Sequence, residues 1–289
     1  MKNTEISFII LTFNEALHLP RLLESLAGLQ AQIYLVDSGS TDQTLEIAAQ
    51  YGAIVKQNTF VNHPKQWHFA LHAFDIPTNW IIGLDADQII SKELYNKLEN
   101  FSDSTIPSEI NGIYFNRKNY FRGQWLRHGG YFPKYLLKMF RNGVGFSDLN
   151  ENMDHRFVVP GKTMIWQDAY LLEENLKEND ISFWLSKHNK YSDMLAKEEV
   201  ERIQNLRKQT IQGKLFGASP DEKIAYLKNI WWKLPLYVRP FLYFIYRFIF
   251  QLGILDGKQG RLFHFLHAFW FRLIIDVKIE ELLRNEKEK

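Results

Sequence analysis

The sequence has no cysteine among its 289 residues. Disulfide bonds, thiolate metal sites and cysteine nucleophiles are therefore excluded, and the composition is compatible with a reducing compartment. The sequence also lacks a large excess of charge of one sign, because the formal net charge is only +2. A nearly neutral chain gives no support for binding through bulk electrostatics, so we expect no nucleic-acid partner.

Long apolar runs and two common nucleotide-binding signatures are also missing. The first apolar run, Ile6 to Leu11, is too short for a signal peptide or a membrane span. We therefore expect the chain to start and stay in the cytoplasm. Neither a Walker sequence nor a GxGxxG occurs in the chain. The length still allows a sizeable buried core.

The first hundred residues alternate short runs rich in β-branched residues with helical patterns. This alternation is typical of a parallel sheet covered by helices, so the predicted fold class is α/β. Ser40 and Gln43 predict a capping box that opens one helix, and Ser91 is expected to open another. Strands are expected at Ile6 to Leu11, Ile33 to Val36, Ala53 to Val55 and Trp80 to Leu84.

The pattern changes near Gly112, where longer strand-like segments begin. We predict a first domain over residues 1–225, with two halves over about 1–110 and about 111–225. Residues 226–289 are predicted to form a C-terminal helical segment, because they are dense in aromatic residues and arginine.

Asp85, Ala86 and Asp87 follow the fourth apolar run directly. In an open α/β sheet, ligands bind beyond the carboxyl ends of the strands, so both carboxylates would project towards a ligand. Two carboxylates one residue apart offer hard oxygen ligands to Mg²⁺ or Mn²⁺, which can in turn hold a diphosphate. A turn with two solvated aspartates is the alternative for this motif taken alone.

Two more polar segments follow earlier runs: residues 12–15 (TFNE) follow the first, and residues 37–42 (DSGSTD) follow the second. All three segments are expected at the same edge of the sheet. Helix capping is the alternative for the second segment. Capping does not explain Asp37, which could accept hydrogen bonds from a base or a ribose.

Together these motifs resemble those of family 2 glycosyltransferases of the GT-A fold, a Rossmann-like domain. That family carries T-[YF]-N-E after its first strand, D-x-[SG]-S-x-D-x-T after its second and DxD after its fourth. This chain has matching residues at 12–15, 37–44 and 85–87. Later segments resemble the lipopolysaccharide-core and exopolysaccharide branch of the family, namely residues 127–141, 184–191 and 252–260.

The resemblance implies an inverting transferase that uses a nucleotide-diphosphate sugar, with a UDP-sugar as the first candidate donor. Residues 1–225 would be its catalytic domain, with the donor half over about 1–110 and the acceptor half over about 111–225. Mg²⁺ or Mn²⁺ on Asp85 and Asp87 would hold the diphosphate. A short polar motif of this branch falls on Lys65 and Gln66, although Trp67 replaces the more usual polar neighbour. The donor-binding residues implied in this way are Thr12, Phe13, Glu15, Asp37, Ser40, Lys65, Gln66, Asp85 and Ala86.

An inverting transfer also needs a general base for the acceptor hydroxyl. The branch commonly shows a His-Glu or Asn-Glu pair past the DxD, and here Glu151 follows Asn150. Glu151 is therefore the first candidate for the base and Asp154 the reserve, while His155 would complete the metal shell. An ordinary polar loop is the alternative.

The aromatic tail predicts a membrane-facing surface. Six cations and two anions lie between Arg239 and Lys278, and the apolar runs 241–255 and 262–275 are too short to span a bilayer. This composition favours a helical hairpin on an anionic membrane surface. With a lipid-linked or lipopolysaccharide acceptor, the enzyme would be peripheral on the inner face of the cytoplasmic membrane. A buried hairpin or a dimer interface is the alternative.

Two other function classes share parts of this pattern. A sugar-1-phosphate nucleotidyltransferase has the same sheet type, but it normally opens with a Gly-rich loop containing Arg and Lys, unlike residues 12–15. A catalytically silent, membrane-peripheral nucleotide-sugar binding protein would keep the fold and lose the chemistry. The intact carboxylates at Asp37, Asp85, Asp87 and Glu151 argue against it.

Overall fold

A computed structural model describes residues 5–150, 155–204, 206, 210–217 and 219–287. The chain forms two compact units, and neither is continuous in sequence. The boundary predicted between residues 225 and 226 falls inside helix α6 (Pro220–Trp231) of the second unit. The division into a donor half and an acceptor half stays a prediction. The first unit contains Met1–Lys118, Lys134–Leu149 and Asp154–Leu176, and the second contains Asn119–Pro133, Asn150–Met153 and Lys177–Lys289.

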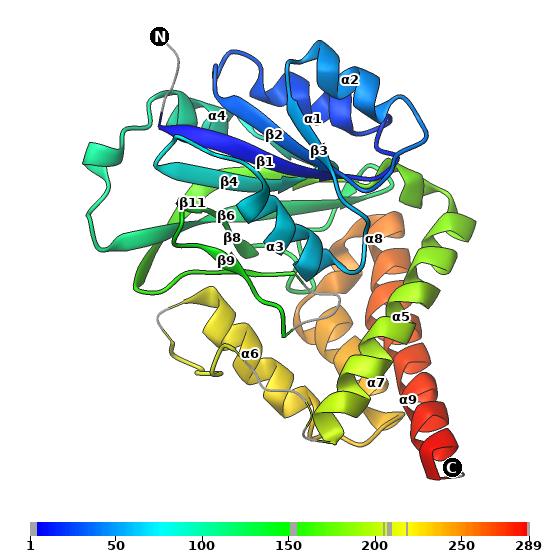
Figure 1. The fold of residues 1–289 in the computed structure, drawn as a ribbon. Helices are drawn as coiled ribbons and strands as arrows, with labels where there is room; N and C mark the ends of the chain where they lie inside the picture. Colours follow the sequence, from blue (N-terminus) through cyan, green and yellow to red (C-terminus); the bar gives the residue numbers. More distant parts are fainter. Residues whose placement is uncertain (1–4, 151–154, 205, 207–209, 218, 288–289) are drawn as a thin grey trace. The chain divides into compact units, whose positions relative to one another are not determined.

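The first unit is built on a mixed sheet with the strand order β3-β2-β1-β4-β8-β6-β11-β5 (Figure 1). The first four strands in this order are parallel, and β8 runs antiparallel to both β4 and β6. The predicted α/β class is confirmed. The strands are β1 (Ile6–Thr12), β2 (Gln32–Asp37), β3 (Ile54–Gln57), β4 (Trp80–Asp85), β5 (Gln88–Ile90), β6 (Ile110–Phe121), β8 (Tyr135–Arg141) and β11 (Lys162–Glu173).

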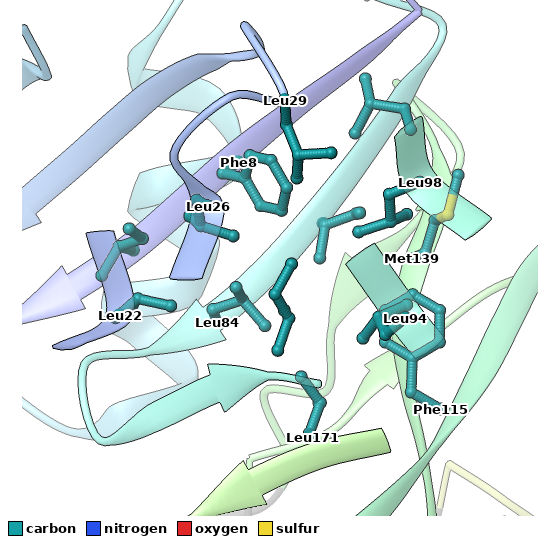
Figure 2. Close-up of a cluster of buried hydrophobic side chains, with 14 of the residues drawn as sticks. Phe8, Leu22, Leu26, Leu29, Leu84, Leu94, Leu98, Phe115, Met139 and Leu171 are labelled. Atoms are coloured by element: carbon teal, nitrogen blue, oxygen red, sulfur yellow. The ribbon is translucent and has the colours of Figure 1, made fainter. Parts of the chain in front are cut away.

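Side chains of β1 alternate between two hydrophobic clusters, because successive residues of a strand point to opposite faces. Phe8 packs on one face with Leu22 and Leu94 (Figure 2). Ile9 packs on the other face in a cluster that contains Trp67. Helices therefore cover both faces, as a parallel sheet requires. The helices of this unit are α1 (Leu19–Leu26), α2 (Thr44–Gln50), α3 (His63–Ala73), α4 (Lys92–Glu99) and the 3-10 turn η1 (Asp103–Thr105).

The two predicted helix starts have different outcomes. Ser91 caps α4, and its side chain accepts a hydrogen bond from the Leu94 amide at 3.3 Å. The capping box predicted at Ser40 and Gln43 is wrong, because α2 begins without a side-chain cap. The Ser40 hydroxyl donates to Asp37 Oδ1 at 2.5 Å instead. A buried carboxylate is a stronger acceptor, and it takes the hydroxyl away from the helix start.

A short antiparallel pair, β9 (Phe146–Ser147) and β10 (Phe157–Val158), packs against the centre of the sheet. Gly83 in β4 makes this possible. A Cβ atom at Gly83 would lie 2.4 Å from Cζ of Phe157 and 3.1 Å from Cη2 of Trp67. The absence of a side chain in the middle of a buried strand thus lets two aromatic rings approach the backbone.

Helices dominate the second unit, and a buried ion network joins three of them. Arg239 Nε and Nη2 donate to Asp276 Oδ1 at 2.8 and 2.6 Å, and Nη1 donates to Glu199. The 3-10 turn η2 (Leu176–Asn179) lies where the chain passes from the first unit to the second. The elements of the second unit are β7 (Gln124–Trp125), α5 (Ile181–Ile203), α6, α7 (Val238–Ile245), η3 (Tyr246–Phe250), η4 (Gly253–Leu255), α8 (Gly257–His264), η5 (Phe265–Trp270) and α9 (Phe271–Lys287).

Asp256 joins two segments of the second unit that are far apart in the sequence. Its carboxylate accepts hydrogen bonds from the amides of Arg127 and His128, at 3.0 and 3.1 Å, and from both imidazoles of His128 and His264, at 2.8 and 2.9 Å. Gly129 has φ 62°, and a Cβ atom there would lie 2.1 Å from Cε1 of His264. The HGG and LDG sequences, which lie in two of the segments that resemble the lipopolysaccharide-core branch, therefore meet in one packing contact.

Candidate functional site

The carboxyl ends of three neighbouring strands place the predicted polar segments side by side. In the sheet register, Thr12 pairs with Asp37, and Leu11 pairs with Asp85. The chain therefore leaves β1, β2 and β4 at one edge of the sheet. This is the edge at which ligands bind in open α/β sheets.

Asp37 is buried, and hydrogen bonds from the protein saturate its carboxylate. Oδ1 accepts from the hydroxyls of Thr12 and Ser40 at 2.9 and 2.5 Å, and Oδ2 accepts from the amides of Gly39 and Ser40 at 2.9 and 2.8 Å. Four donors fill the four acceptor positions of a carboxylate. Asp37 thus shapes the loop after β2, and a nucleotide would have to replace one of these donors to bind it.

The loop after β1 interlocks with the loop after β2. Asn14 has a left-handed backbone (φ 54°), and its amide donates to Ser40 Oγ at 2.7 Å. The amide of Thr41 donates to Asn14 Oδ1 at 2.8 Å. Asparagine tolerates positive φ better than most residues, so this position suits the turn. Phe13 lies between Thr12 and Asn14, which are both held by hydrogen bonds to the second loop. Its ring is 56% exposed at the edge where the strands end.

His18 and Asn175 tie the remaining carboxylates to the end of β11. His18 is buried, with Nδ1 2.5 Å from Glu15 Oε2, and its Nε2 accepts a hydrogen bond from the Leu176 amide at 2.8 Å. The Leu176 contact leaves the proton on Nδ1, where it faces Glu15. One residue earlier, Asn175 Nδ2 donates to Asp87 Oδ2 at 3.2 Å. Glu15 and Asp87 are both oriented by this segment.

The two residues predicted to touch a diphosphate differ in accessibility. Gln66 is buried, and its amide bonds to Ser38 Oγ at 3.0 Å and to the Asn58 side chain at 2.8 Å. It therefore holds loops together rather than facing solvent. Lys65 lies in the first turn of α3 and its side chain is exposed.

Asp85 lies between two nitrogen groups. Lys138 Nζ on β8 is 2.9 Å from Oδ2, and His63 Nε2 is 3.4 Å from Oδ1. Burial raises the pKa of Asp85, but the charges and hydrogen bonds of Lys138 and His63 outweigh it and hold the pKa far below the ordinary value. The carboxylate is therefore ionised throughout the physiological range.

The turn between β4 and β5 fixes the rest of the DxD. Gln88 Oε1 accepts a hydrogen bond from the Asp85 amide at 3.1 Å, and its Nε2 donates to Glu173 at 2.7 Å. Ala86 is buried, so its side chain cannot contact a ligand, although its backbone lies in the turn. Asp87 is partly exposed.

His155 packs beside Trp67 and His63 as an uncharged ring. It stacks on Trp67 with ring centroids 5.2 Å apart and lies 5.5 Å from the His63 ring. Burial lowers the pKa of His155 well below its ordinary value, and His63 and Lys138 lower it further. Its Nδ1 is 3.2 Å from Ser147 Oγ, while its buried Nε2 has no hydrogen-bond partner among the described residues.

These residues fit a divalent cation in chemistry, although they are not assembled around one. Within the described residues, no group of three or more His, Asp or Glu side chains is arranged to hold a metal ion. Asp85 and Asp87 offer the oxygen ligands that Mg²⁺ and Mn²⁺ prefer. His155 is neutral and has an unused ring nitrogen, which is the form of histidine that binds metals.

Two residues of this site, Lys138 and His63, were not predicted from the sequence. Lys138 interrupts the apolar run of β8, and a lysine at such a position is the signal that could have found it. His63 carries no comparable signal, because only the fold brings it to Asp85. Glu151 and Asp154, the predicted bases, lie outside the described residues.

The second unit carries an exposed apolar face on α7, η3 and η4. No helix in the described part of the chain combines the length and hydrophobicity needed to cross a bilayer. Large apolar residues are nevertheless exposed along one short stretch, which we call the apolar face: Tyr237, Val238, Phe241, Leu242, Ile245, Tyr246, Ile249, Phe250, Leu252, Ile254 and Leu255. Contiguous exposed apolar residues of this kind mark interaction surfaces.

Near the apolar face, the exposed charges are positive and the acidic side chain is buried. Arg247 lies over the Tyr131 ring at 4.3 Å and is only partly exposed, and Arg239 is buried in its ion network. Between residues 231 and 265, the exposed charged side chains are all cations: Lys233, Lys258 and Arg261. The one acid in this stretch, Asp256, is buried.

Comparison with known proteins gives consistent matches. Residues 7–157 match the model of the family described as Glycosyl transferase family 2. An uncharacterized glycosyltransferase of Rickettsia felis is 28% identical over 211 residues, covering 70% of this chain and 72% of the relative. The lipopolysaccharide core biosynthesis glycosyltransferase LpsC of Rhizobium meliloti is 29% identical over 215 residues, covering 68% and 72%. The crystal structure of S. aureus TarS aligns with TM-score 0.43 at 16% identity, covering 91% of this chain and 48% of that one.

Proposed function

The chain belongs to glycosyl transferase family 2, and we propose that it transfers a sugar, with inversion, from a nucleotide-diphosphate sugar to a lipid-linked or lipopolysaccharide acceptor. A UDP-sugar is the first candidate donor, and Mg²⁺ or Mn²⁺ the expected cofactor. The observation that carries the proposal is the meeting of the Thr12, Asp37 and Asp85 segments at one sheet edge. The name of the R. meliloti relative supports the acceptor class.

Residues at this edge would divide the work of donor binding. The exposed Phe13 ring suits stacking on a base, and Glu15, fixed by His18, offers a carboxylate to polar groups of the nucleoside. The interlocked loops hold Ser40 and Asn14 in place before the donor arrives. Preorganisation of this kind lowers the cost of ordering on binding.

Charge stabilisation of the leaving diphosphate is the larger catalytic task. Asp85, Asp87 and His155 would hold the divalent cation, which supplies positive charge to the departing phosphate oxygens when bound. Lys65, exposed at the start of α3, adds a second cation from the protein. The acceptor oxygen bonds to the anomeric carbon as the bond from that carbon to phosphate oxygen breaks. Glu151 takes the hydroxyl proton, with Asp154 in reserve.

Binding and turnover of nucleotide sugars test this proposal directly. A ligand that binds only the folded state raises apparent stability, by about 2.7 kcal/mol at a hundredfold excess over Kd. We therefore expect the melting temperature to rise with a UDP-sugar plus Mn²⁺ and to change less with either alone. Slow Mn²⁺-dependent release of UDP should accompany it. Binding without any release of nucleotide would instead support the catalytically silent binder.

The apolar face suits attachment to an anionic membrane that carries the acceptor. Its residues would enter the headgroup region, and the exposed Lys258 and Arg261 would contact anionic lipid, each adding about 1 kcal/mol. Peripheral attachment on the inner face of the cytoplasmic membrane follows if the donor is drawn from the cytoplasm. Salt should weaken this binding, because the Debye length falls to about 8 Å at physiological ionic strength.

Replacing Phe250 and Leu255 by serine is expected to lower binding to anionic liposomes roughly tenfold or more. These side chains are 74% and 60% exposed, and full burial of such a residue is worth about 1.5–3 kcal/mol. Co-sedimentation of the full chain with vesicles measures the loss. Phe216→Ser is the matched control, because Phe216 is 96% exposed but lies outside the apolar face.

A second pair of substitutions separates charge from apolar contact. Lys258→Gln with Arg261→Gln is expected to reduce binding to anionic vesicles and to leave binding to neutral vesicles unchanged. Arg247 and Arg272 are unsuitable for this purpose, because both lie against aromatic rings. Absence of pelleting on any vesicle would contradict membrane attachment and leave a second copy of the chain as the partner of this face.

A further inference from the structure

Lys138 is a buried cation in the middle of an apolar strand. Its side chain is 7% exposed, and its neighbours on β8, Leu137 and Met139, are buried. Taking an ammonium group out of water is costly unless a partner compensates it. Asp85 is that partner, at 2.9 Å from Nζ. Lys138 is therefore a cation between buried apolar neighbours, and Asp85 is the partner that compensates its charge.

The partner of Lys138 is a carboxylate that also belongs to the proposed metal site. Asp85 is 28% exposed, so it faces solvent on one side and Lys138 on the other. Its two oxygens face different nitrogens, since His63 approaches Oδ1 and Lys138 approaches Oδ2. A divalent cation arriving at this carboxylate meets one oxygen, Oδ2, that already interacts with the positive charge of Lys138.

We infer that Lys138 is an internal counter-ion of Asp85, which holds the carboxylate in place without metal and competes with the divalent cation for it. The inference rests on the proposed metal-assisted function. Lys138 acts through Asp85, so it is a positioning residue, and it sets how tightly the site holds metal. Weak binding of metal alone then makes loading depend on the donor diphosphate, which supplies further oxygen ligands.

This arrangement makes an unusual prediction for removal of the lysine charge. Lys138→Met keeps a long apolar stem and removes the ammonium group, so Asp85 loses its strongest competitor for metal. Without metal, the variant should melt at a lower temperature, because a partly buried carboxylate has lost its partner. Mn²⁺ alone should bind roughly fivefold more tightly than to the parent, the scale of a partly buried ion pair.

Calorimetric titration of the full chain with Mn²⁺, in the absence of nucleotide, tests the inference. Lys138→Met should show the tighter binding and a larger rise in melting temperature on adding Mn²⁺. Lys138→Arg should not bind Mn²⁺ more tightly than the parent, because a guanidinium pairs with carboxylate at least as well. If Lys138→Met does not fold, Lys138→Gln replaces it in the same comparison.

Arg141→Gln is the matched control. Arg141 lies on the same strand and pairs with Asp103 at 2.8 Å, so its loss removes an ion pair without touching Asp85. This variant should lose stability and keep the parent's affinity for Mn²⁺. If the parent binds Mn²⁺ and Lys138→Met binds it no more tightly than the parent does, the counter-ion inference alone is overturned. Absence of Mn²⁺ binding in every variant, with and without UDP, would overturn metal assistance and the inference together.

Discussion

Asp87→Ala is expected to abolish Mn²⁺-dependent binding of UDP and to lower sugar transfer about a thousandfold, the scale reached when a major electrostatic contribution is removed. Asp87 is partly exposed in the β4–β5 turn and accepts a hydrogen bond from Asn175. No core packing depends on it, so the variant should fold and melt close to the parent. Titration with UDP in the presence and absence of Mn²⁺ measures the binding.

Asp85→Ala is expected to show the same loss of UDP binding together with reduced stability, because Lys138 is left buried without its partner. Asp168→Ala is the control for both variants, since Asp168 is 66% exposed on β11 and pairs only with Lys97 among the ion pairs of the described residues. Parent-like affinity for UDP plus Mn²⁺ in either variant would make the metal assignment wrong.

Glu151→Gln is expected to keep donor affinity and to lose transfer by roughly a hundredfold or more, as removal of a general base usually does. The amide keeps the shape of the side chain and removes its basicity. Single-turnover transfer measures the chemical step, and UDP titration measures the affinity. Because Glu151 lies outside the described residues, this role rests on its place after Asn150 in the sequence.

Two comparisons make the Glu151 result specific. Glu109→Gln changes a carboxylate that is 54% exposed, pairs with Lys162 and lies away from the candidate site, so it should leave transfer unchanged. Turnover at the parent's rate in Glu151→Gln would transfer the role of base to Asp154 or His155.

Strand positions and their polar ends could be predicted from the sequence. Short β-branched runs followed at once by Asp37 or Asp85 fix both the strand and the point where the chain leaves it. Parallel pairing then brings those ends to one edge, whichever helices cover the sheet. The family was predicted for the same reason, because its motifs stand at strand ends, and the match over residues 7–157 confirms it.

Partners of individual side chains could not be predicted in this way. Ser40 has the right spacing for a helix cap, yet Asp37 takes its hydroxyl, and the competition between the two is decided in three dimensions. Gln66 stands beside Lys65 in the sequence, but only the fold shows that its amide is used by Ser38 and Asn58. Counting charges along the tail could not show, for the same reason, that Arg239 is buried.

The hydrogen bonds between Asp256 and residues 127–128 can form only late in synthesis of the chain. Residues 119–133 are synthesised before β8 and β11, but the carboxylate that binds the amides of Arg127 and His128 follows more than a hundred residues later. At ordinary rates of translation, this segment waits on the order of ten seconds for its partner. Through much of its synthesis, a nascent chain therefore carries this Gly-rich hairpin without its hydrogen bonds to Asp256. A chaperone or a protease would meet the hairpin in that interval.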